Sequence, residues 1–165
     1  MSGGDASALQ RDAAAVDASV WVAASAGTGK TKVLTDRVLA LMLAGSAPAS
    51  ILCLTFTKAA AAEMANRLHD RLSRWTTLSD GALAQDLAAL TGEMPDEAVC
   101  RQARRLFARV LDTPGGIRID TMHAFCQALL RRFPIEAGVA PHLEVMDERS
   151  AGEVLFAAQI GRAHV

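Results

Sequence analysis

The sequence predicts an α/β fold, a parallel sheet with flanking helices, because three short runs of strand type each lead into a helical stretch. These runs are Val20–Ala23, Ile51–Thr55 and Ile117–Thr121. The second run is continuously apolar, which predicts a parallel strand buried in the sheet. The residues that follow the runs are therefore expected at the carboxyl edge of the sheet, where ligands of such folds collect.

The first junction contains a loop that reads Ala24-Ser25-Ala26-Gly27-Thr28-Gly29-Lys30-Thr31, followed by a predicted helix over 31–44. A loop of this kind wraps backbone N–H groups round a phosphate, and the next helix adds its dipole. Lys30 would reach the β- and γ-phosphates of a nucleotide, while the Thr31 hydroxyl would ligate Mg²⁺. Ala24 departs from the strict pattern, which has glycine there. The context nevertheless favours a nucleotide-phosphate site over an ordinary strand-to-helix turn.

A short helix is predicted over Leu9–Ala14, just before the first run, and its Gln10 is a candidate contact for a base. The amide of a glutamine offers a donor and an acceptor side by side, which match the N6 and N7 edge of adenine. The spacing taken by itself favours a solvated helix residue.

The second junction carries Thr55, Phe56, Thr57 and Lys58 at the end of its strand, before a long helix that is predicted to begin with residues 59–68. Hydroxyl groups, a ring and an ammonium group suit a phosphodiester backbone with one base stacked on the ring. An equally weighted alternative places Phe56 in the core beneath the helix.

The third junction places Thr121 and His123 between a strand and an amphipathic helix over 122–133. A hydroxyl and an imidazole at a strand end can both hydrogen-bond to phosphate. A lone histidine at a helix start is more often a cap or a packed ring, so this junction is weak when taken alone.

The region 75–112 is less informative. It reads as turn-rich over 76–81, a short helix over 83–90, and a second helix that Asp96 can cap. Four arginines lie along that second helix, namely Arg101, Arg104, Arg105 and Arg109. A solvated face of a helical hairpin is favoured there over contact with a phosphate chain.

Composition limits the class of protein. The chain has 165 residues, 51% of them hydrophobic, which suits one domain with a core. Its net charge of −1 provides no global basic field, so any DNA contact must be local. Three separate cysteines indicate reduced thiols and no metal cluster, and no apolar run approaches the about 18 residues of a membrane span. We expect a soluble cytoplasmic protein without a membrane partner.

The three junctions together resemble motifs of superfamily 1 DNA helicases of the UvrD and RecB kind. Ala24–Thr31 is similar to their Walker A motif, Leu54–Met64 to motif Ia, and Thr121–Phe125 to the next DNA-contact motif. The form Lys-Ala-Ala-Ala-Ala-Glu-Met that begins at Lys58 resembles AddA, the helicase–nuclease subunit of bacterial double-strand-break repair. Ala59 stands where many relatives have lysine.

The resemblance, which covers about 9–159, implies a RecA-like P-loop fold, the incomplete motor domain 1A, over 1–145. It implies ATP and Mg²⁺ as cofactors, with Gln10 on adenine. It further implies single-stranded and double-stranded DNA as substrates, contacted by Thr55, Phe56, Thr57, Lys58, Thr121 and His123. A second subunit of AddB type and a later nuclease domain are implied for the whole protein. Residues 146–159 would start a helical insertion, and 160–165 resemble a translated sequencing adapter, a non-native tail.

Asp147 and Glu148 look like the end of a Walker B strand, but Glu144 interrupts the apolar run, so we do not expect them to be catalytic. We then expect an N-terminal fragment that does not hydrolyse ATP alone. Two other interpretations of the loop remain open. They are a P-loop phosphotransferase such as a small-molecule kinase, and a non-catalytic nucleotide-binding module.

Overall fold

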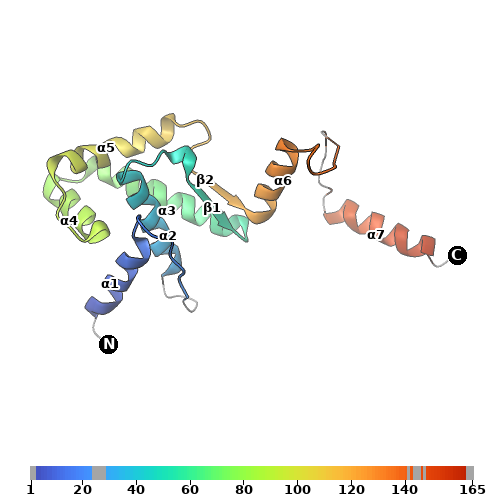
Figure 1. Cartoon of the computed structure of the whole chain (residues 1–165), viewed down its shortest axis with the longest axis horizontal. Coiled ribbons are helices and arrows are strands. Elements are labelled where there is room, and N and C mark those ends of the chain that lie inside the picture. Colours follow the sequence, from blue (N-terminus) through green and yellow to red (C-terminus); the bar gives the residue numbers. More distant parts are fainter. Residues whose placement is uncertain (1–2, 24–28, 141, 143–145, 147, 163–165) are drawn as a thin grey trace. The chain divides into compact units, whose positions relative to one another are not determined.

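A computed structural model of the protein describes residues 3–23, 29–140, 142, 146 and 148–162, and they form a mixed α/β structure. The chain divides into two compact units, 1–121 and 122–165. The first unit contains, in order, α1 (Gly3–Ala14), α2 (Lys30–Leu43), a 3-10 turn (Pro48–Ser50), β1 (Leu52–Thr55), α3 (Lys58–Thr77), α4 (Asp80–Thr91), α5 (Glu97–Asp112) and β2 (Arg118–Thr121) (Figure 1).

The sheet of the described residues consists of β1 and β2, which pair in parallel from Leu52 opposite Arg118 to Thr55 opposite Thr121. This pairing confirms that the second and third runs are parallel neighbours. The expectation of a buried strand is wrong for β1, since Leu52 and Leu54 stay 39% and 41% exposed. The reason is that α3 packs along the two strands, while Leu52 and Leu54 point to the face that remains open.

The first predicted strand is also absent. Residues 20–23 are irregular backbone, and Trp21 is 93% exposed. A strand is stable only when its N–H and C=O groups pair with a neighbour. The sheet of the described residues has only β1 and β2, so this apolar run lacks the partner strand that its composition requires.

The helix starts follow the sequence closely. The Thr57 hydroxyl accepts from the N–H of Ala60 at the start of α3, and the Asp96 carboxylate accepts from the N–H of Val99 over 2.8 Å at the start of α5. These contacts satisfy donors that a helix end leaves unpaired. The predicted turn at 76–81 is shorter than expected, because the hydroxyls of Thr76 and Thr77 bond to carbonyls within α3 and let the helix continue.

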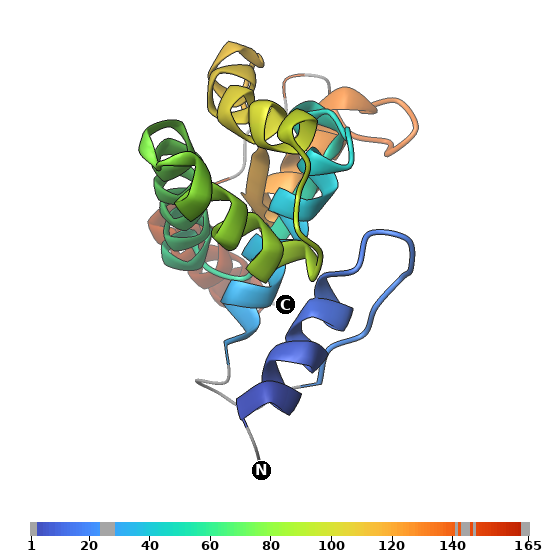
Figure 2. The same cartoon turned by 90° about the vertical axis from the view of Figure 1, so that its left-hand side faces the viewer.

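The core of the first unit lies between α2, α3, α4 and α5 (Figure 2). Its largest side chain is that of Trp75, which is fully buried. Leucines at helical spacing on α3 and α4 point into it, as the amphipathic pattern predicts. The buried core residues are Val38, Leu39, Met42, Ile51, Met64, Leu68, Leu72, Trp75, Leu83, Leu87, Leu90, Ala103 and Leu106.

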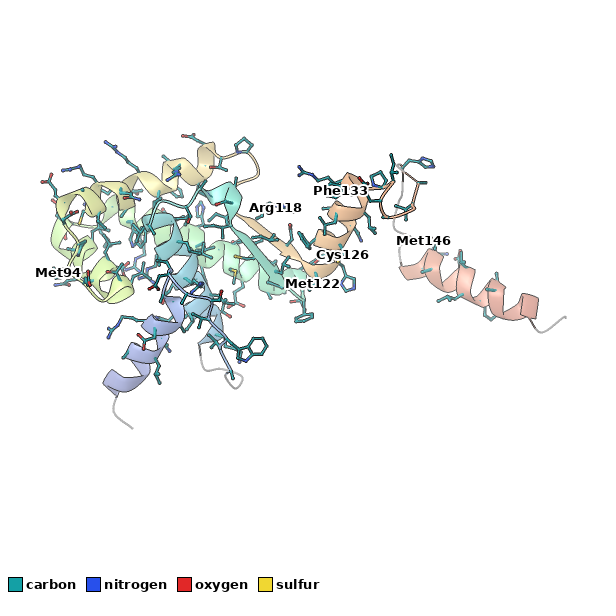
Figure 3. All side chains as sticks on the ribbon, in the orientation of Figure 1. Met94, Arg118, Met122, Cys126, Phe133 and Met146 are labelled. Atoms are coloured by element: carbon teal, nitrogen blue, oxygen red, sulfur yellow. The ribbon has the colours of Figure 1, made fainter. Side chains whose placement is uncertain are left out.

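The second unit contains α6 (Met122–Arg132) and α7 (Glu148–Arg162). Figure 3 labels Cys126 and Phe133 on and after α6, and both side chains are exposed. Within the described ranges of both units, none of the helices has the length and hydropathy needed to cross a bilayer.

Candidate functional site

The N-terminus of α2 is the part of the predicted phosphate loop that the structure describes. Gly29 is the N-cap residue and has a φ of 87°, a left-handed conformation that suits glycine. Lys30 and Thr31 are the first two residues of the helix, and no acidic side chain lies in its first turn. Such a turn attracts anions through its N–H groups and its dipole. The predicted site residues Ala24, Ser25, Ala26, Gly27 and Thr28 lie outside the described residues.

Lys30 is exposed and lines a cavity of about 200 Å³, together with apolar side chains that include Val20, Val22 and Val33. Thr31 is half-buried, and its carbonyl accepts a hydrogen bond from the Thr35 hydroxyl over 2.8 Å. Lys30 and Thr31 therefore lie in the first turn of α2, where the N–H groups and the dipole of a helix attract anions.

Gln10, the predicted base contact, lies beside this turn. Its Nε2 atom is 3.5 Å from the point where a Cβ on Gly29 would stand. Gln10 also lines a cavity of about 230 Å³ between α1, α2 and α4, whose other walls include Lys32 and Asp36. The structure thus brings together Gln10 and the phosphate-loop residues Gly29 and Lys30, which the sequence separates by about twenty positions.

Arg37 binds the backbone just after α1 to α2. Its guanidinium donates to the carbonyl of Ala15 and, over 2.7 Å, to the carbonyl of Ala18. Both acceptors lie just after α1, which also packs against α2. Because an arginine fork can hold two carbonyls at once, Arg37 keeps α1 and its Gln10 next to the start of α2.

Lys32 and Asp36 are site-lining residues that sequence reasoning missed. The Lys32 ammonium contacts the Asp36 carboxylate over 2.7 Å, one helical turn away. Their spacing of four residues is a visible signal. The partner that holds Asp36 from the other side, Arg71 on α3, lies 35 residues away and leaves no local signal.

The second candidate site lies at the carboxyl end of the sheet. Thr55 and Thr121 end β1 and β2 and stand opposite each other in the parallel register, as expected for strand-end residues. The Thr55 hydroxyl donates to the Thr57 carbonyl over 3.1 Å. Thr57 caps α3, and Lys58 is the exposed first residue of that helix.

Phe56 follows β1 and is 87% exposed. The alternative that placed this ring in the core beneath the helix is therefore wrong. An exposed ring beside two strand ends has a face on which a planar group can stack. The sheet end thus combines a ring, an ammonium group and hydroxyls at one edge.

The remaining predicted site residues do not belong to the first unit. His123 is the exposed second residue of α6 and belongs to the second unit. Asp147 lies outside the described residues, and Glu148 is the first residue of α7. Cys53 lies on β1, and burial raises the pKa of its thiol, which favours the unreactive neutral form.

The four arginines of α5 serve different purposes. Arg104 donates to the carbonyls of Trp75, Thr76 and Leu78 and to the Asp80 carboxylate, so it joins α5 to the end of α3. Arg101, Arg105 and Arg109 are exposed, as a solvated face predicts.

Comparison with known proteins adds the family. The UvrD/REP helicase N-terminal domain matches residues 6–162. Similar proteins, each named as a component of an ATP-dependent helicase/nuclease, include one from Lactobacillus gasseri, 32% identical over 148 residues, which are 88% of this chain and 10% of the relative. One from Pelotomaculum thermopropionicum is 34% identical over 154 residues, 92% of this chain and 10% of the relative. One from Desulforamulus reducens is 35% identical over 138 residues, 82% of this chain and 9% of the relative.

The chain therefore spans about 10% of the length of these relatives. The similarity to UvrD-like helicases, and to AddA among them, is confirmed. Because the family match covers nearly the whole chain, including the predicted phosphate loop and both strand ends, this chain belongs to the UvrD/REP helicase N-terminal domain family.

Proposed function

We propose that the chain is the ATP-binding N-terminal part of an ATP-dependent DNA helicase or translocase of AddA type. The observation that carries the proposal is that the Gln10 side chain lies beside Gly29, the N-cap residue of the helix that begins at Lys30. One place then offers an amide for a base and a helix N-terminus with a cation for phosphates.

We assign a set of residues to each part of ATP. Gln10 would read the adenine edge from the cavity that Lys32 and Asp36 also line. Lys30 would neutralise the β- and γ-phosphates, and residues 24–29 would supply backbone donors. The Thr31 hydroxyl would ligate the Mg²⁺ that accompanies the nucleotide, and this ion would help to neutralise charge during phosphoryl transfer.

DNA is proposed for the sheet end. Phe56 would stack on a base, while Thr55, Thr57, Lys58, Thr121 and His123 would contact phosphates. The opposed positions of Thr55 and Thr121 support this part of the proposal, because two contact motifs then reach one strand of DNA together. A small-molecule kinase would leave the exposed Phe56 and these paired strand ends without a purpose.

The proposal also covers the domain organisation, substrates and partner of the whole protein. Residues 1–145 would form the first part of motor domain 1A, 146–159 would begin a helical insertion, and 160–165 would be a non-native tail. Single-stranded and double-stranded DNA would be the substrates in recombination and repair, with a second subunit of AddB type and a cytoplasmic location. The chain alone would bind ATP without turnover. Arg37 lines the same cavity as Lys30, but it donates to the carbonyls of Ala15 and Ala18, so none of the described residues of the proposed site supplies a free arginine to the transferring phosphoryl group.

The proposal is tested by nucleotide binding to the chain in the absence of DNA, with a fluorescent ATP analogue and Mg²⁺. A charge-assisted hydrogen bond contributes about 1.5 to 3 kcal/mol. We therefore expect Lys30→Ala to weaken binding by about 10- to 100-fold.

Lys58→Ala is the matched control, because Lys58 is also the exposed first residue of a helix. It should leave nucleotide affinity unchanged when DNA is absent. Equal affinities of the wild type and Lys30→Ala, or equal losses in both variants, would contradict the proposed nucleotide site.

A further inference from the structure

We propose that the exposed face of α5 is a contact surface for the phosphate backbone of duplex DNA. The surface consists of Arg101, Arg105 and Arg109, which together form the arginine ridge. This inference rests on the proposed function and adds a second DNA surface to it, built from residues outside both strand ends.

The ridge is a row of charges along one side of α5. Its members are four residues apart, so they share one face of the helix and rise by about 6 Å per step, or about 12 Å in all. They line a groove of about 440 Å³ together with Ala98, Gln102 and Leu106. Figure 3 shows long side chains with nitrogen tips projecting outward from α5.

The helix itself is held in place by other residues. Ala103 and Leu106 are buried in the core on its inner side. Arg104 joins it to the end of α3, and the Gln102 amide donates to the Leu43 carbonyl at the end of α2 over 2.7 Å. The ridge is therefore presented on a helix whose packing is fixed by residues other than the three arginines.

The charges of the ridge are largely unused by the fold. Among the described residues, Arg105 and Arg109 have no ion-pair partner, and Arg101 contacts only the exposed Glu97 one turn away. An exposed pair of that kind contributes little and exchanges readily for another anion. The acidic residues of α5, Glu97 and Asp112, are its first and last residues.

A phosphate backbone matches this pattern. One strand of a duplex presents a phosphate about every 3.4 Å along the axis, so a row of about 12 Å faces three to four of them. Proteins that read single strands stack bases on exposed rings. The aromatic residue of α5, Phe107, is not an exposed stacking ring, because it packs edge-on against His69 of α3 with ring centroids 5.1 Å apart. Contact with phosphates and not with bases favours a strand whose bases are already paired.

The test is binding of the full 165-residue chain to a duplex of about 20 base pairs, and to a single strand of the same length, by fluorescence anisotropy over a range of salt concentrations. In Arg105→Gln/Arg109→Gln two phosphate contacts are lost. Each contributes about 0.9 to the slope of log affinity against log salt, so the duplex slope should fall by about 1.8. The single-strand slope should not change.

Arg67→Gln/Arg74→Gln is the control, because it removes two positive charges from exposed positions of α3. Its duplex slope should equal that of the wild type, and circular dichroism should show the same helix content in both variants. An unchanged duplex slope in Arg105→Gln/Arg109→Gln, or an equal fall of the duplex slope in the control variant, overturns the proposal that the arginine ridge contacts DNA. An equal fall for duplex and single strand overturns the duplex assignment. A wild-type chain that binds neither DNA contradicts the proposed function together with the ridge.

Discussion

Arg71 of α3 donates a hydrogen bond from Nη1 to Oδ1 of Asp36 on α2 over 2.8 Å. Its Nε donates at the same time to Oδ2 of Asp86 on α4 over 2.9 Å, and that oxygen also accepts from the Trp75 indole over 2.6 Å. Asp36 is only 7% exposed, and its second oxygen holds Lys32. The helix that begins at Lys30 and the helix that begins at the sheet end are thus joined by Arg71, whose side chain is 20% exposed.

Arg71→Met is expected to destabilise the chain strongly, because it leaves Asp36 and Asp86 without their shared cation. Removing one partner of a fully buried ion pair costs about 3 to 5 kcal/mol. The Arg71 and Asp86 side chains are 20% and 22% exposed and Asp36 keeps Lys32, so the loss should lie below that range but above that of an exposed pair. The control is Arg67→Met, whose ion pair with Glu63 is about half exposed on both sides and is worth at most about 1 kcal/mol. Urea unfolding followed by circular dichroism measures both. Equal losses of unfolding free energy in the two variants would contradict the stabilising role of the Arg71 contacts.

Phe56→Ala is expected to weaken single-strand DNA binding without loss of stability. The ring is 87% exposed, so truncation opens no core cavity, whereas loss of one stacked base costs about 1 to 3 kcal/mol of binding free energy. Phe156→Ala, which truncates another exposed ring on α7, should leave the affinity unchanged. Fluorescence anisotropy with an oligothymidine gives the affinities. An unaltered affinity for Phe56→Ala would remove this ring from the proposed DNA contact.

Thiol labelling should distinguish the cysteines. Burial raises the pKa of the Cys53 thiol, so at a mildly alkaline pH its thiolate fraction is lower than that of an exposed cysteine. Cys126 is exposed and should react with iodoacetamide first, with Cys53 last. Because the fold favours the neutral thiol of Cys53, this contribution to stability is present below the pKa of the unfolded thiol and is lost as pH rises through the higher folded pKa.

Mass spectrometry of digested samples taken over time measures this order. In denaturing urea the rates of Cys53 and Cys126 should become similar, which is the internal control. Faster labelling of Cys53 than of Cys126 in the folded chain would contradict the burial of β1 at that residue.

Several features of the fold can be predicted from residues close together in the chain. Asp96 is predicted as a cap because a helical pattern begins one residue later, and the structure has this contact. The strands at 51–55 and 117–121 are also predicted with nearly correct bounds, and the helices after them with nearly correct first residues. Each of these depends on hydrogen bonds within a few residues or on an alternation of polar and apolar side chains.

The prediction of a strand at Val20–Ala23 is wrong, because local composition cannot supply a hydrogen-bonding neighbour. The sequence also does not decide whether Phe56 is exposed, since a ring after a strand can turn into the core or away from it. Neither outcome depends on the residue type; each depends on which surfaces lie next to it in the folded chain.

The sequence by itself determined most of the helices, the cap at Asp96, the parallel pair of strands and the family, because each follows from local patterns or from motifs in a fixed order. Only the tertiary structure decided that Gln10 lies beside Gly29, that Arg71 joins Asp36 to Asp86, and that Arg104 serves packing while its neighbours on α5 face solvent. These contacts join residues 15 or more positions apart. Packing of whole helices sets them, and no local pattern encodes that packing.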